Sequence, residues 1–407
     1  MSDGYGAAGR IALGAPVHET IDTGSPAAWV ALDAEVRNLA PHAASLLPTR
    51  QELRGLPAGE PTPTEEARIA LALCHPDGRV RGAALEPASG VATLRPLLVV
   101  RCADWVAPVR LRARELLADV SGRRLVSLAW LILLLARRER GGFAGDLLDR
   151  ALRDGPAADV ESLLTSEDRA VRRLGYRIAV DRRLLPPAEL ARTAATASGD
   201  TRVQTLCAEA ALAAMGEDDH GNVVDPLLAA RSPQVRSTGV TALRRAGRHS
   251  EAAAFLADRA GVVRACARYV LRQAGCDPLP LYRSMCADAA RHPAAAAGLG
   301  ECGSSADAEA LWALTTHPVP AVRAHAVAGL CALDAVHPER MRPLIDDQAA
   351  PVVRAAGRAL RPYATGLPSD WLLARLSPEL PAPTRLAAQR LMDVRSRAQA
   401  RGLPVVL

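Results

Sequence analysis

A valine, followed in most copies by arginine and then by small apolar residues, recurs along the chain. The pattern reads APVVRAAGRAL at 350–360, VPAVRAHAVAGL at 319–330 and SPQVRSTGVTAL at 232–243. Successive copies are 28 to 32 residues apart, except for two gaps of 62 and 59 residues. This spacing constrains the fold strongly, because a fixed period predicts one structural unit stacked many times. The pattern position is occupied by Val80, Val109, Val171, Val203, Val235, Val263, Val322, Val353 and Thr384.

The two long gaps are each about twice as long as the others. We therefore expect a degenerate copy near residue 140 and another near residue 293, where the sequences GGFAGDLLDRAL and RHPAAAAGLGECG occur. With these two copies, eleven units of about thirty residues cover Thr64 to Arg397.

Each unit divides into two amphipathic helices that are joined by a short turn. In the copy at 304–335, apolar residues follow helical spacing on both sides of Pro318 and Pro320, which end one helix and precede the next. A single unit cannot bury its own apolar stripe, so neighbouring units must stack. Because no sustained β-type alternation occurs, we expect an all-α solenoid of about eleven helix–turn–helix repeats. Other copies place a capping side chain in the turn, at Asp77, Asp104, Asp168, Asp200 and Ser232.

The repeated pattern resembles HEAT repeats, most completely at 232–243 and 347–360. Its period is shorter than the usual HEAT length of about 40–47 residues. It is closer to the short HEAT-like repeats of bilin-lyase subunits. The resemblance covers about four-fifths of the chain and implies a helical-repeat fold that serves many roles.

The resemblance also implies that each arginine after the pattern valine pairs with a turn acid of its own or an adjacent repeat. We call this set the arginine ladder. Its members are Arg81, Arg110, Arg172, Arg236, Arg264, Arg323 and Arg354, of which Arg81, Arg172, Arg236 and Arg323 are assigned to the ladder alone.

We expect four parts along the chain. Residues 1–25 are rich in Gly and Ala and predict a flexible N-terminal tail. Residues 26–63 predict a helical segment that caps the first repeat, with partner binding as the alternative. The repeats occupy 64–397, and 398–407 form a C-terminal tail.

The apolar run LVSLAWLILLLA at 125–136 predicts a buried helix, because a membrane span needs about twenty such residues. The first residues have no signal-peptide pattern. The eight cysteines include no C-x-x-C pair and suit a reducing compartment. We therefore expect a cytoplasmic protein with no membrane partner.

All 50 basic residues are arginine, so every one of these cations can form paired hydrogen bonds with a carboxylate or phosphate. Residues 101–140 contain nine arginines and four acids, and 379–407 contain five arginines and two acids. Residues 1–66 have the opposite balance, with nine acids and four arginines. The asymmetry suggests an anionic partner near the basic segments, with a solvated charged face as the alternative.

Several second helices contain arginines four residues apart, a spacing that is mildly destabilising in an isolated helix. Neighbouring acids or an anionic ligand could offset this repulsion. The candidate partner-binding residues are Arg110, Arg114, Arg264, Arg268, Arg272, Arg354, Arg358 and Trp105.

The sequence contains no P-loop, H-E-x-x-H or G-x-S-x-G motif, and we expect no cofactor, no metal site and no catalytic residue. The favoured function is a scaffold that binds another protein with an acidic segment. A second reading follows from HEAT-like alkylpurine DNA glycosylases, which imply a basic groove for DNA and a carboxylate near tryptophan. Asp104 beside Trp105 is the candidate arrangement, and a capping acid beside a structural tryptophan is its alternative. Lyase activity, by analogy with the short repeats, has no motif here.

Overall fold

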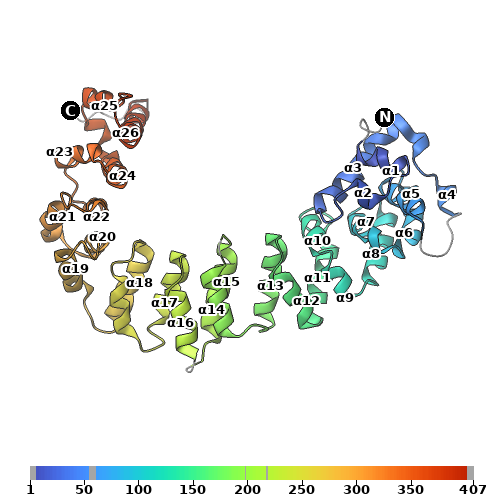
Figure 1. The fold of residues 1–407 in the computed structure, drawn as a ribbon, viewed down its shortest axis with the longest axis horizontal. Coiled ribbons are helices and arrows are strands. Elements are labelled where there is room, and N and C mark those ends of the chain that lie inside the picture. The colour runs from blue at the N-terminus through green and yellow to red at the C-terminus, as the bar shows by residue number, and fades with distance from the viewer. Residues whose placement is uncertain (1–5, 55–60, 198, 217–218, 401–407) are drawn as a thin grey trace. The chain divides into compact units, whose positions relative to one another are not determined.

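The computed structural model describes residues 6–54, 61–197, 199–216 and 219–400. Within these residues all regular secondary structure is helical, and many short helices pack in a repeat-like way (Figure 1). The chain divides into two compact units, residues 1–185 and residues 186–407.

The start of the first unit differs from the flexible tail expected for residues 1–25. Helices α1 (Ala7–Ala12) and α2 (Val17–Thr20) pack against α5 (Pro63–Cys74), and α1 also packs against α3 (Pro26–Ala43). Ile11 is buried, and Glu35 of α3 accepts a hydrogen bond of 3.1 Å from a backbone amide of α1. Ala8, Gly9 and Ile11 therefore give α1 a buried face. Residues 1–5 lie outside the described part.

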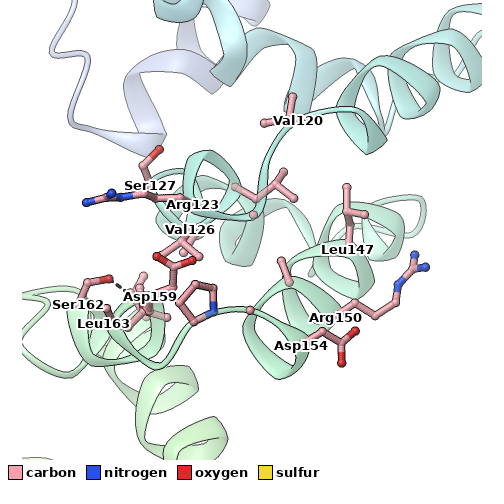
Figure 2. Close-up of a pocket in the computed structure, with 18 of the residues that line it drawn as sticks. Val120, Arg123, Val126, Ser127, Leu147, Arg150, Asp154, Asp159, Ser162 and Leu163 are labelled. Carbon is pink, nitrogen blue, oxygen red and sulfur yellow. Dashed lines mark hydrogen bonds between the residues drawn. The ribbon is translucent and has the colours of Figure 1, made fainter.

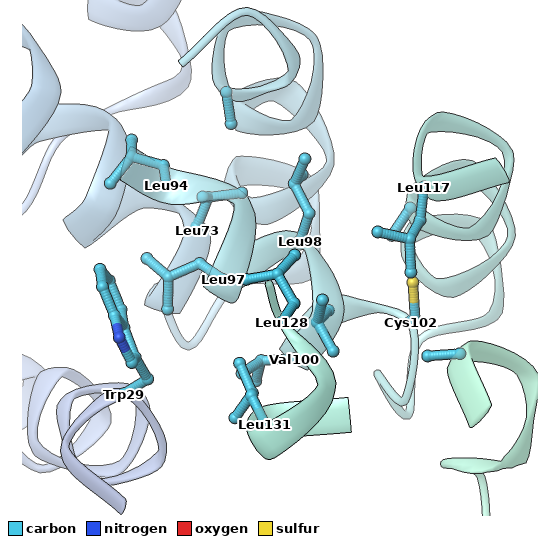
Figure 3. Packing of buried hydrophobic residues seen from close by; sticks show 14 of the residues in the cluster. Trp29, Leu73, Leu94, Leu97, Leu98, Val100, Cys102, Leu117, Leu128 and Leu131 are labelled. Atoms are coloured by element: carbon cyan, nitrogen blue, oxygen red, sulfur yellow. The ribbon is translucent and has the colours of Figure 1, made fainter. Parts of the chain in front are cut away.

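Helix α3 forms where the capping segment was expected. Its apolar face buries Trp29, Leu32 and Val36. Trp29 lies beside leucines that come from the region of α7 (Arg95–Arg101) (Figure 3).

The remaining helices of the first unit follow as pairs. Helix α5 packs on α6 and also on α7, while α6 packs on α8. Aspartates at the turns cap the second helix of a pair: Asp168 accepts from the amides of Ala170 and Val171 at 2.7 and 3.1 Å. The bounds are α4 (Arg50–Arg54), α6 (Gly78–Ser89), α8 (Ala107–Ala118), α9 (Gly122–Val126), α10 (Ala129–Leu135), α11 (Gly142–Asp154), α12 (Ala157–Leu164) and α13 (Arg169–Asp181).

The apolar run at 125–136 forms parts of two short helices, α9 and α10, where one helix was expected. Most of its side chains are buried, while Ser127 is exposed and Leu134 is 37% exposed. Among the described helices, none combines the length and apolarity that crossing a bilayer requires.

The second unit repeats the same arrangement. Its second helices form a row in which α20 packs on α22, α22 on α24 and α24 on α26. The bounds are α14 (Pro187–Thr196), α15 (Thr201–Ala214), α16 (His220–Leu228), α17 (Pro233–Ala242), α18 (Gly261–Gln273), α19 (Pro278–Ala287), α20 (Ala295–Cys302), α21 (Ala308–Leu314), α22 (Pro320–Ala332), α23 (Pro338–Met341), α24 (Ala350–Ala359), α25 (Ser369–Ala374) and α26 (Ala382–Ala400). Short 3-10 helices include η4 (His249–Phe255) and η6 (Arg342–Asp346).

The recurring pattern position marks the core of both units. All eight pattern valines and Thr384 are buried, with at most 6% of any of them exposed. Helix α26 extends to Ala400, so the C-terminal tail expected from residue 398 begins inside this helix, and 401–407 lie outside the described residues.

Candidate anion-binding groove

Three ladder arginines each form an ion pair with two hydrogen bonds to an aspartate that lies 22 to 24 residues later in the chain. Each pair has two N···O distances between 2.7 and 2.9 Å. The third nitrogen of each arginine donates to carbonyls at the preceding turn. The pairs are Arg81 with Asp104, Arg236 with Asp258 and Arg323 with Asp347.

The electrostatics of these three aspartates are alike. Burial alone would raise the pKa of each carboxyl group, but hydrogen bonds from the arginine and from a backbone amide outweigh it. The pKa of each aspartate is therefore below its usual range, and each carboxylate stays ionised.

The other ladder arginines have different partners. Arg110 and Arg172 donate to the backbone oxygens of Asp104 and Ser166 at 2.7 and 2.6 Å. Arg264 contacts the carboxylate of Glu301, which lies on α20 and is not a turn acid.

Two further candidate arginines are also engaged inside the fold. Arg268 shares Glu301, with an N···O distance of 2.5 Å. Arg114 donates to the backbone oxygens of Cys102 and Arg140, both at 3.1 Å. These guanidinium groups are occupied before any partner arrives.

Trp105 is half-exposed, and its ring lies between two guanidinium groups. The central carbons of Arg37 and Arg81 are 4.1 and 4.2 Å from the ring centroid, which is cation–π geometry. The neighbouring Asp104 carboxylate has no exposed surface and accepts from both Arg81 and Arg101. It is thus fully engaged and closed to a substrate.

Several of the arginines that have no hydrogen-bonding or ion-pair partner among the described residues lie together in the second unit. A groove of about 520 Å³ lies between α24 and α26. Five arginines line it, all of them exposed, and no described residue forms a hydrogen bond or ion pair with their side chains. We call this surface the arginine groove, and its five arginines are Arg354, Arg358, Arg361, Arg390 and Arg397. Arg272 is similarly exposed and unpaired, but it lies on α18 outside this groove.

Helical spacing explains why the arginine side chains converge. Arg354 and Arg358 are four residues apart on α24 and so share one side of it. Arg361 follows three residues later, at the start of the 3-10 helix η7 (Arg361–Gly366), and lines the same groove. Arg390 and Arg397 are seven residues apart on α26, which again places them on one side.

Two contacts hold α26 close to its neighbours, one to α24 and one to η6. A Cβ built at Gly357 of α24 would lie 3.2 Å from the Cβ of Ala387, so glycine permits a close approach of α26. Thr384 at the start of α26 donates to the backbone oxygen of Ile345 at 3.0 Å.

The floor of the arginine groove is apolar. It includes Leu386, which is 49% exposed, together with Pro383 and Val394. The single acid of the lining, Asp393, accepts a hydrogen bond of 2.9 Å from Gln389. Five arginines against one aspartate give the lining a net charge of +4, which favours an anionic occupant.

Sequence reasoning named Arg354 and Arg358 as candidates and missed Arg390 and Arg397. Two signals were available for the missed pair: the positive balance of residues 379–407 and the seven-residue spacing on one helix. Neither signal indicates that α26 packs against α24.

Other chemistry is scarce in the described residues. They contain no group of three or more His, Cys, Asp or Glu placed to hold a metal ion. Burial raises the pKa of Cys102 and of Cys207 to about 12, so these thiols stay protonated.

Comparison with known proteins adds little to this geometry. No protein-family model matches the sequence, and no curated protein is significantly similar to it. One solved structure, described as a crystal structure of an engineered protein, matches over 96% of this chain and 99% of its own, with 14% identity and a TM-score of 0.21. A TM-score this low carries no argument about fold or function.

Proposed function

We propose that the protein is a HEAT-like scaffold, an α-solenoid of about eleven short repeats, that binds an acidic segment of a partner protein in the arginine groove. The observation that carries the proposal is the contrast between engaged and free arginines. The ladder pairs use their guanidinium groups inside the fold, whereas the five groove arginines have no partner among the described residues. Arginine clusters of this kind recognise acidic motifs in other proteins.

The apolar floor favours a protein segment over a nucleic acid. An acidic peptide that also contains a leucine or valine would bury Leu386 while its carboxylates meet the arginines. The groove lining contains no aromatic side chain on which bases could stack. The same proposal places the chain in a reducing compartment such as the cytoplasm, since all eight cysteines are free.

The test is fluorescence anisotropy with a labelled peptide of alternating glutamate and leucine. We expect binding that weakens with added salt, and at least about tenfold weaker binding when glutamine replaces each glutamate, because charge-assisted hydrogen bonds are lost. Arg358→Glu and Arg390→Glu should each weaken binding at least about tenfold.

The matched control is Arg272→Glu, an exposed and unpaired arginine outside the groove, which should leave affinity unchanged. Labelled duplex DNA is titrated in parallel. Tighter binding of DNA than of the peptide, or equal effects of the Arg272 and Arg358 reversals, would contradict the proposal and favour a diffuse phosphate-binding surface.

A further inference from the structure

The first unit contains a larger cavity, of about 1170 Å³, that lies among α9, α10, α11 and α12 (Figure 2). Its lining is mixed, with Val126, Leu147 and Leu163 beside charged groups. The volume is slightly above the range of about 300–1,000 Å³ that is usual for ligand pockets. The cavity can therefore hold an organic molecule or a few residues of a peptide.

Asp159 is the unusual member of this lining. Its residue surface is only 9% exposed, and no described side chain or amide forms a hydrogen bond or ion pair with its carboxylate. The hydroxyl of Ser162 donates to the backbone oxygen of Asp159, at 2.7 Å, and leaves the carboxylate free. The carboxylate oxygens of Asp159 therefore open onto the cavity, where a group bound in the cavity can reach them.

The described residues compensate the negative charge of Asp159 only weakly. Asp159 lies in the first turn of α12, where the helix dipole favours an acid by about 0.3–1 kcal/mol. Arg123 and Arg150 line the same cavity, but both are exposed and neither pairs with it. In Figure 2 the carboxylate lies beside Val126, while the guanidinium group of Arg150 lies across the cavity.

Other buried acids of the chain show the contrast. Asp104 accepts from Arg81 and Arg101, and Asp307 accepts from Arg283 at 2.8 Å. Asp159 has no such cation among the described residues, and it faces a cavity large enough to admit one.

We propose that this cavity binds an organic cation, an ammonium or guanidinium group attached to an apolar body. The cation pairs with Asp159, and the body contacts Val126, Leu147 and Leu163. A free alkyl amine and the basic side chain of a partner protein share this chemistry, and the experiment separates the two sources.

The experiment measures binding to the full chain by ligand-observed NMR. The probes are hexylammonium, the neutral hexanol of similar size, and two capped peptides of alanine with a central arginine or a central glutamine. We expect a cationic probe to bind roughly tenfold or more tightly than its neutral counterpart, because one charge-assisted hydrogen bond distinguishes them. Preference for hexylammonium identifies a free amine, and preference for the arginine peptide alone identifies a partner side chain.

Asp159→Asn should abolish the preference for the cation and keep weak binding of hexanol. Asp154→Asn is the matched control, because Asp154 lines the same cavity but is exposed, and it should leave the preference intact. Equal binding of cationic and neutral probes to the unaltered chain would overturn the proposal, as would a preference that survives Asp159→Asn. If a variant folds poorly, the comparison of cationic and neutral probes on the unaltered chain still tests the proposal.

Discussion

Around Asp104, two buried arginines share one carboxylate, whereas in the arginine groove five exposed arginines surround an apolar floor. In the first region Arg101 also pairs with Asp33, so both arginines have a carboxylate partner inside the fold, and the ion pairs link one pair of helices to the next. In the second region Asp393 is the single acid of the lining, so most of the repulsion among the five arginines is not offset by the described residues. The difference shows that arginine count alone does not indicate a binding surface, because what matters is which carboxylates the fold brings within reach.

The largest effect is expected from Asp104→Asn. The change leaves Arg81 buried without a carboxylate and leaves Arg101 with Asp33 alone, so we expect the free energy of unfolding of this region to fall by about 3–5 kcal/mol. Urea denaturation followed by circular dichroism measures the loss. The control Asp393→Asn, in the exposed lining of the arginine groove, should shift stability by less than about 0.5 kcal/mol. Equal shifts in the two variants would remove the distinction between the regions.

A matched pair of substitutions one repeat apart tests the comparison directly. Arg323 and Arg354 occupy the same position of the pattern, but only Arg323 has an aspartate partner. Arg323→Gln should lower the free energy of unfolding by about 1–3 kcal/mol, because it leaves Asp347 without its cation. Arg354→Gln should change it by less than about 0.5 kcal/mol while weakening binding of the acidic peptide. Comparable destabilisation by both would mean that Arg354 is engaged in solution.

The smallest effect is a dependence on pH. The pKa of Asp347 is lowered in the folded chain, so its stabilising contribution is complete above the unfolded pKa of about 4 and is lost as pH falls through the folded value. Thermal unfolding followed from about pH 7 to about pH 3 should show wild type losing more stability than Asp347→Asn. Parallel curves would show that the ion pair contributes nothing to the acid sensitivity.

Much of the fold could be predicted from the sequence. The valine period located the core positions, and Asp77 and Asp168 cap helices at the expected turns. Both regions with a degenerate copy contain helices, α10 with α11 and α19 with α20. The order of residues 6–25 could not be predicted from their Gly-rich composition, because it depends on the apolar surface that α3 and α5 present to Ile11.

The arginine groove was predictable only in part. An acid lies 22 to 24 residues after Arg81, Arg236 and Arg323, while Leu376, Ser377 and Pro378 occupy that interval after Arg354. That absence was a usable signal. It is not sufficient, because Asp288 lies 24 residues after Arg264, yet Arg264 pairs with Glu301. Spacing predicts which groups can meet, and the packing of each degenerate copy decides whether they do.

The ladder pairs have a consequence for how the second unit opens. Each pair joins one helical repeat to the next. In a nearest-neighbour description it therefore adds to the coupling between repeats and not to the stability of any single repeat. Coupling of this kind makes neighbouring repeats unfold together. The last ladder pair among the described residues, Arg323 with Asp347, precedes α24. After it, the more exposed pair of Arg375 with Asp346 joins α25 to η6. We therefore expect the helices that form the arginine groove to separate at a lower free energy than the rest of residues 186–407. An occupant that contacts both α24 and α26 would hold the two helices together.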